Sequence, residues 1–98
     1  MKIIKTSTVL ANFEGKPLKN GTKDWTVGDA VSFVLGGRVS NPTLGWILGK
    51  KFATQKQVEL RAEDVVFIKK EVEENKELFA VLAGQLIEIL DGKESKEK

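Results

Sequence analysis

The sequence predicts an α+β fold, in which a small antiparallel sheet (a hairpin plus a third short strand) packs against about four helices in the order ββααβαα. Apolar residues recur at helical spacing in four segments after residue 26. Residues 1–25 are instead rich in β-branched and turn-forming residues. With 98 residues the chain has room for one core, so we expect a single domain over 1–91, followed by a disordered charged tail over 92–98.

The first two strands are predicted on either side of a turn. The segment from Thr6 to Leu10 is rich in β-branched residues, and the turn residues 12–15 separate it from the segment 16–19. Pro17 cannot donate a ladder hydrogen bond and therefore belongs on an edge. The alternation of polar and apolar residues over 57–60 predicts the third strand.

Capping residues and apolar periodicity delimit the helices. Thr26 is a good N-cap for a helix over 26–35 that ends at Gly36-Gly37, and Asn41 or Ser40 caps a second helix over 43–54. A third helix begins at 62–64, where Glu63 and Asp64 place acidic residues in its first turn, and it breaks near Asn75. A fourth begins between 77 and 81 and ends before residue 92.

The composition argues against several kinds of chemistry. The chain has no cysteine, histidine or tyrosine, so it lacks the commonest general base, thiolate nucleophiles and most transition-metal ligands. We expect no enzyme, no cofactor and no metal, and we interpret the acidic run at 71–77 as a solvated surface. No apolar run is long enough for a membrane span, and residues 1–10 lack a secretory signal, so we expect a cytoplasmic protein.

Charge is divided unequally along the chain. Residues 1–56 carry nine Lys or Arg and three Asp or Glu, a net charge of +6, whereas residues 57–98 carry seven and eleven, a net charge of −4. Such a division can hold the two halves of one fold together, attract a polyanion to the basic half, or favour head-to-tail association of copies. The sequence leaves these three interpretations open.

The second helix carries the residues most suggestive of a binding surface. Gly45 and Gly49 are costly in a helix interior, which close approach of another backbone or irregular helix geometry would explain. Phe33 and Trp46 fall partly off the inner stripes and would suit a protein interface. The predicted partner-binding residues are Phe33, Gly45, Trp46 and Gly49, with Lys50 and Lys51 at the rim.

Nucleic-acid binding is the alternative interpretation. The helices over 26–35 and 43–54 resemble a helix-turn-helix in outline, and four cations are candidates for phosphate contacts: Arg38, Lys50, Lys51 and Lys56. Against this, the second helix offers few polar side chains for reading base edges.

Several segments together resemble small proteins encoded by tailed phages and prophages. They are the turn NFEGKPL, the helical segments TVGDAVSFVL and LGKKFAT, and the C-terminal stretches VELRAEDVVFIKKEV and VLAGQLIEIL. The resemblance covers most of the chain as a pattern and implies an accessory or assembly factor that acts by binding, in the host cytoplasm if phage-encoded. It assigns no functional residue, and Arg61, where a Ser, Thr or Asp cap is usual, departs from an ordinary helix start.

The expected function is therefore that of a noncatalytic phage or prophage accessory protein. It would act through contacts with a protein partner or with itself. The alternative is a small DNA- or RNA-binding module that uses the basic N-terminal half.

Overall fold

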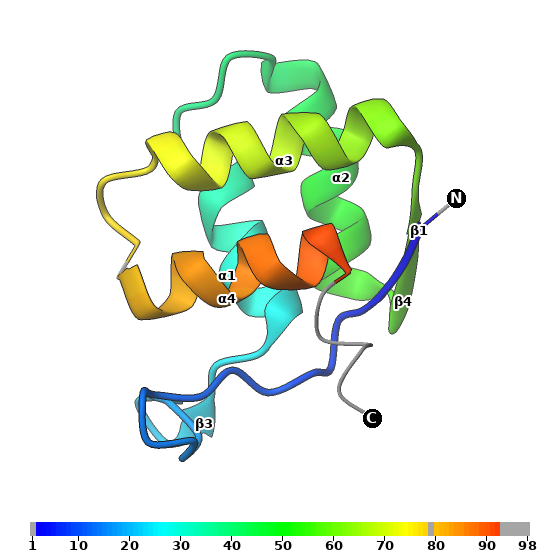
Figure 1. Cartoon of the computed structure of the whole chain (residues 1–98). Coiled ribbons are helices and arrows are strands. Elements are labelled where there is room, and N and C mark those ends of the chain that lie inside the picture. Colours follow the sequence, from blue (N-terminus) through cyan, green and yellow to red (C-terminus); the bar gives the residue numbers. More distant parts are fainter. Residues whose placement is uncertain (1, 79, 93–98) are drawn as a thin grey trace.

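The computed structural model describes residues 2–78 and 80–92 and confirms the α+β class (Figure 1). Four short strands and four helices follow one another in the order βββααβαα. The strands are β1 (Lys2–Lys5), β2 (Lys19–Asn20), β3 (Lys23–Asp24) and β4 (Gln57–Leu60). The helices are α1 (Val27–Leu35), α2 (Pro42–Thr54), α3 (Ala62–Glu74) and α4 (Ala80–Asp91).

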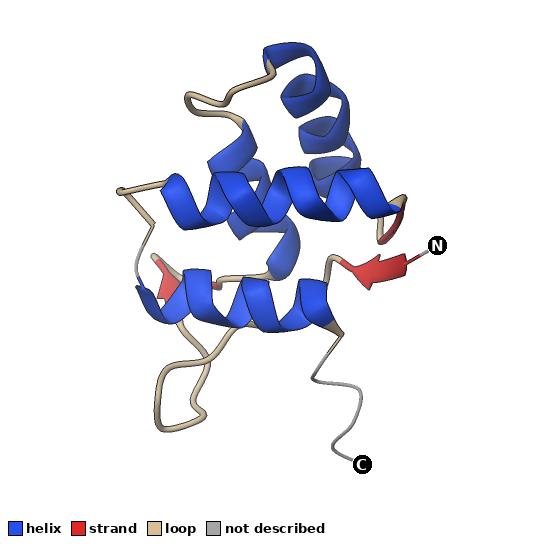
Figure 2. Ribbon diagram, turned by 45° about the horizontal axis from the view of Figure 1, so that its top comes forward, coloured by secondary structure: helices blue, strands red, loops and turns tan. Residues whose placement is uncertain are grey.

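The helices form two antiparallel pairs that cross. In Figure 1, α3 and α4 lie across the front of α1 and α2, and Figure 2 shows the same arrangement from another angle. The ammonium of Lys69 lies 2.6 Å from a carboxylate oxygen of Asp91 and joins α3 to the end of α4. One cluster of buried side chains fills the space between the pairs, and it includes Leu48, Phe52, Ile68 and Leu86.

The helix starts follow the capping residues of the sequence. The hydroxyl of Thr26 accepts a hydrogen bond from the backbone N–H of Asp29, and the side chain of Asn41 accepts one from the N–H of Leu44. Both bonds satisfy amides that an α-helix leaves without an internal partner. These two local interactions set the first turns of α1 and α2.

The pairing of the strands differs from the expected arrangement. The first strand is β1, upstream of residues 6–10, and it pairs antiparallel with the distant β4, with Ile4 opposite Val58. The expected hairpin is reduced to short pairing around the turn, including a bridge between Ala11 and Pro17. A second small sheet joins β2 to β3.

Thr6, directly after β1, also forms hydrogen bonds with the chain before β4. The hydroxyl of Thr6 donates to the carbonyl of Gln55 at 2.6 Å, and the Thr6 N–H donates to the carbonyl of Lys56. Thr6 therefore continues the contact between the N-terminal segment and the chain before β4, after which the backbone turns toward α1. The expected strand 57–60 has the predicted bounds.

Two further expectations meet the structure only in part. The predicted charged tail at 92–98 falls outside the described residues except for Gly92, which follows α4 with φ +79°. Within residues 2–78 and 80–92, no helix combines the length and apolar character that crossing a membrane requires.

Candidate partner-binding groove

A shallow apolar hollow lies between α1 and α2, and we call it the Trp46 groove. Its volume is about 240 Å³. The residues that line it are Ser32, Leu35 and Gly36 from α1 and its end, and Gly45, Trp46, Gly49, Lys50 and Ala53 from α2. Four of the six predicted partner-binding residues are thus brought together in one hollow.

The glycines of α2 explain how the groove forms. A Cβ atom on Gly45 would lie 3.3 Å from the carbonyl oxygen of Leu35 and 2.9 Å from a methyl group of Val39. A Cβ on Gly49 would lie 3.5 Å from the Cβ of Leu35. Close approach of another backbone, one of the two explanations left open by the sequence, therefore occurs within the chain at Gly45. The small residues leave a hollow beside the contact between α1 and α2.

Trp46 forms one wall of the groove and is largely exposed. Its side chain is 66% exposed, and the ammonium of Lys50, one turn further along α2, lies 5.1 Å from the centroid of its ring. This is a cation–π distance, and it holds a positive charge at the mouth of the groove. In the part of the chain that the structure describes, no carboxylate lies within ion-pair distance of Lys50.

Phe33 lies beside a second hollow, which we call the Phe33 pocket. Its side chain is 43% exposed and meets the edge of Trp25 in a T-shaped contact, with ring centroids 6.3 Å apart. The pocket has a volume of about 530 Å³. It is lined by Ser32, Phe33, Gly36, Gly37, Arg38, Glu74, Asn75, Lys76 and Glu77.

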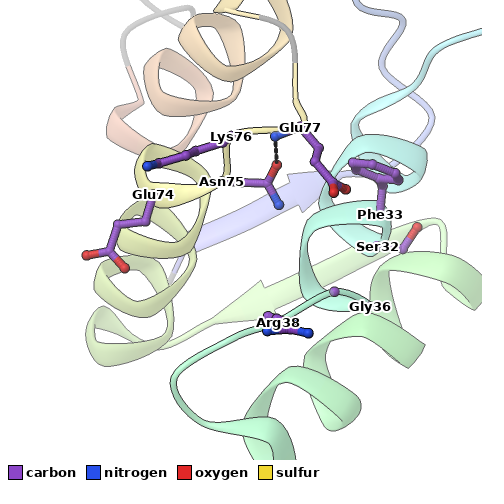
Figure 3. A pocket seen from close by; sticks show the side chains of 9 residues that line it. Ser32, Phe33, Gly36, Arg38, Glu74, Asn75, Lys76 and Glu77 are labelled. Carbon is purple, nitrogen blue, oxygen red and sulfur yellow. Dashed lines mark hydrogen bonds between the residues drawn. The ribbon is translucent and has the colours of Figure 1, made fainter.

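The two hollows are neighbours, because Ser32 and Gly36 line both. Figure 3 shows Arg38 on the α1–α2 connection, across the Phe33 pocket from Lys76 and Glu77 on the α3–α4 connection. The pocket's charges balance, since Glu74 and Glu77 stand against the two cations. The Trp46 groove, by contrast, has one cation and no anion among its lining residues.

The remaining predicted basic residues face other surfaces. Lys51 is half-buried and lines a different hollow together with Arg61 and Asp64, and Lys56 lines a third, beside Thr6. Successive residues of an α-helix point about 100° apart, which separates Lys51 from Lys50. The four cations of the nucleic-acid interpretation are therefore distributed over several hollows.

The unusual cap at Arg61 is explained by Asp64. The backbone N–H and the guanidinium of Arg61 both donate to this buried carboxylate, at 3.0 Å and at 3.1 and 3.2 Å. The hydrogen bond from the Arg61 guanidinium lowers the pKa of Asp64, and the positive charge of Lys51 contributes in the same direction. These contacts between Arg61 and Asp64 stabilise the first turn of α3, so we assign them a structural role.

Sequence reasoning missed four lining residues of the groove and one exposed aromatic residue. Ser32 and Ala53 carried no prediction, and Leu35 and Gly36 were predicted only as the end of the first helix. The small residues nevertheless recur every fourth residue, at Ser32 and Gly36 in one segment and at Gly45, Gly49 and Ala53 in the other. That recurrence is the signal that could have found the groove. The exposed aromatic is Phe13, whose segment was interpreted only as a turn.

No match to this chain was found among protein-family models, curated proteins or solved structures. Within residues 2–78 and 80–92, no group of three or more acidic residues is placed to hold a metal ion.

Proposed function

We propose that this protein is a noncatalytic binding protein whose Trp46 groove receives an apolar side chain from a protein partner. The observation that carries the proposal is an exposed tryptophan beside a hollow floored by small residues, with the lysine ammonium over its ring. Rigid aromatic anchors near small pockets are the usual energetic centres of protein interfaces. The phage or prophage setting remains a prediction from the sequence.

The size of the groove favours a side chain over a free small molecule. At about 240 Å³ it is smaller than the roughly 300–1,000 Å³ typical of small-molecule pockets. A single aromatic or large aliphatic side chain would fill much of it, and the rest of the partner would cover the exposed face of Trp46. Six of the nine residues that line the larger Phe33 pocket are polar or charged, and this pocket would lie at the edge of such an interface.

Lys50 indicates a second feature of the proposed partner, which is an acidic residue. A cation at the mouth of an apolar groove favours a carboxylate beside the inserted side chain, because the pair would be partly shielded from water in the complex. The groove is therefore suited to a segment in which an aromatic or aliphatic residue stands next to an acidic one. Nucleic acid is less suited, since its phosphates would meet only one lysine here.

Selection from a random peptide library tests the proposal. We expect the immobilised protein to enrich peptides that combine an aromatic or large aliphatic residue with an acidic neighbour. The Trp46→Ala variant should lose these peptides, while Val66→Ala should retain them, because Val66 is equally exposed at 66% but lies on α3. Equal retention by both variants would overturn the proposal.

A second arm of the experiment tests the nucleic-acid alternative. Labelled single- and double-stranded DNA and RNA are titrated with the protein at two salt concentrations. Tight binding that weakens steeply with salt and is lost in the Lys50→Glu/Lys51→Glu variant would replace the protein-partner proposal.

A further inference from the structure

The turn at residues 12–16 presents an apolar side chain next to an acidic one. Phe13 is 93% exposed, the most exposed of the large apolar residues described, and Glu14 follows it. This is the combination that the Trp46 groove favours. The side chain of Phe13 is therefore accessible to a partner, and burying it in a groove would remove a large apolar surface from water.

Hydrogen bonds hold this turn in one shape. The side-chain oxygen of Asn12 accepts from the N–H groups of Glu14 and Lys16, at 2.8 and 3.0 Å, and the N–H of Asn12 donates to the carbonyl of Lys16. Gly15 supplies the left-handed residue, with φ +86°. Phe13 is therefore presented by an ordered turn, which reduces the conformational entropy lost when it binds.

The base of the turn is attached to the helical body. The amide of Gln85 on α4 receives a hydrogen bond from the N–H of Ala11 at 2.9 Å and donates one to the carbonyl of Ala11. In Figure 1 the turn projects at the lower left, away from the α1–α2 connection at the top. The turn is thus placed to contact another molecule.

We propose that the groove's partner is a second copy of this chain, and that Phe13 of one copy inserts into the Trp46 groove of the next. This inference rests on the proposed function and identifies the partner that occupies the Trp46 groove. Glu14 of the inserted turn pairs with Lys50 beside Trp46, which supplies charge complementarity. The turn and the groove are different surfaces, so two copies either exchange turns reciprocally in a two-fold dimer or bind head-to-tail, and repetition of the head-to-tail contact gives a ring or an open chain.

A second pair of opposite charges is available beside the groove. The turn carries Lys16 two residues after Glu14, and the exposed Asp29 of α1 lines a neighbouring hollow that shares Ser32 with the Trp46 groove. The inserted turn therefore brings one acidic and one basic residue toward a surface that has one of each. The interface is small, and interfaces below roughly 1,200 Å² are typical of weak and transient association.

Sedimentation velocity on the whole protein, from about 10 µM to about 1 mM, measures this weak association. We expect the average mass of the wild type to rise with concentration. Phe13→Ala and Trp46→Ala should each weaken association by roughly tenfold or more, and Val66→Ala should not. All three side chains are largely exposed, so circular dichroism should show unchanged folds.

Mixing the two variants tests the pairing itself. Phe13→Ala retains the groove and Trp46→Ala retains the turn, so a mixture should form a one-to-one heterodimer at concentrations where each variant alone is monomeric. Glu14→Lys and Lys50→Glu should each weaken association, and the two changes in one chain should restore it. If the mixed variants form no heterodimer, or if the exchanged charges do not restore association, the insertion of Phe13 into the Trp46 groove is overturned.

The other outcomes separate this inference from the proposed function. Association that depends on Trp46 but not on Phe13 would overturn the insertion of the Phe13 turn. The Trp46 groove would still be a binding site in that case. A wild type that stays monomeric throughout, or association indifferent to both residues, overturns self-docking. Peptide selection then decides whether the groove binds protein at all.

Discussion

The Lys50 ammonium lies 5.1 Å from the centroid of the Trp46 ring, one turn away on the same face of α2. This pair combines the two properties on which the proposed groove depends, an exposed apolar wall and a positive charge. Because both side chains belong to one helix, their positions relative to one another are largely set before a partner binds.

Replacing Lys50 by Met tests this pair, since the change removes the charge and keeps an unbranched side chain. Exposed cation–π contacts contribute about 0.5–1 kcal/mol, so we expect the free energy of unfolding in urea to fall by about that amount. The control is Lys56→Met, at an exposed lysine in a different hollow. An equal effect in both variants would contradict the account.

The glycines of the helices should respond differently to alanine. Gly45→Ala places a methyl group 2.9 Å from Val39 and should cost about 1–3 kcal/mol of unfolding free energy. Gly84→Ala on α4, with nothing within 4 Å, should add about 0.4–1 kcal/mol. Gly49→Ala makes an ordinary contact with Leu35 and should resemble Gly84→Ala. Urea unfolding that ranks Gly45→Ala beside the other two would show that the helices do not approach closely there.

Acid should remove part of the stability that Asp64 supplies. The hydrogen bond from Arg61 lowers the pKa of Asp64 in the folded state. The ionised Asp64 therefore makes its full contribution to the free energy of unfolding above the pKa of about 3.9 that an aspartate has in the unfolded chain. The contribution is lost as pH falls through the lower folded pKa. The stability difference between wild type and Asp64→Asn should therefore shrink as unfolding is measured from about pH 6 to about pH 2.

Asp29→Asn is the matched control for that series. Asp29 occupies the same third position of α1, but it is exposed and has no arginine at its cap. We expect this variant to keep the acid-dependent loss seen in the wild type. A pH-independent difference between wild type and Asp64→Asn would rule out the charged pair as its source.

A buried carboxylate attaches the α1–α2 connection to α3. Glu71 is 5% exposed, so the expected solvated surface at 71–77 is wrong for this residue. Its carboxylate accepts hydrogen bonds from the Ser40 hydroxyl at 2.6 Å and from the Ser40 N–H at 3.3 Å. Ser40→Ala leaves this carboxylate short of a donor and should lower the free energy of unfolding by about 1–3 kcal/mol. Ser40→Thr should retain most of the stability.

Ser32→Ala is the comparison for Ser40, because the Ser32 hydroxyl donates to a backbone carbonyl at an exposed site. Thermal unfolding should show a much smaller loss for this variant. Similar losses at both serines would mean that the contact between Ser40 and Glu71 does not hold the connection in place.

The helices could be predicted because their signals are local. Thr26 and Asn41 stand directly before the helices they cap, and in α1, α3 and α4 the apolar period continues to the glycine or asparagine that follows the helix. The pairing of β1 with β4 could not be predicted in this way, because the partners are distant in the sequence. The segment from Lys2 to Lys5 has only four residues, and its two adjacent isoleucines do not show the alternation that identifies a strand.

The site was predicted in part for the same reason. Gly45, Trp46, Gly49 and Lys50 lie on one helix, and their spacing alone places them near one another. The opposite wall comes from α1, where the four-residue spacing of Ser32 and Gly36 is visible in the sequence, but only the packing of the two helices shows that these small residues face those of α2. Phe13 escaped notice because its neighbours predict a turn and carry no information about the exposure of its side chain.

The molecule that binds in the Trp46 groove can be identified most directly by placing a photoreactive benzoylphenylalanine at position 46. The same residue at position 66, on α3, is the control. In cells that produce the protein and in purified samples, irradiation should join position 46 to a protein, with the Phe13 turn of a second copy recovered by mass spectrometry. Cross-linking of position 46 to a different single protein would support the groove as a binding site and would show that its partner is not a second copy of this chain. Identical adducts at positions 46 and 66, or nucleic acid at position 46, would contradict the account.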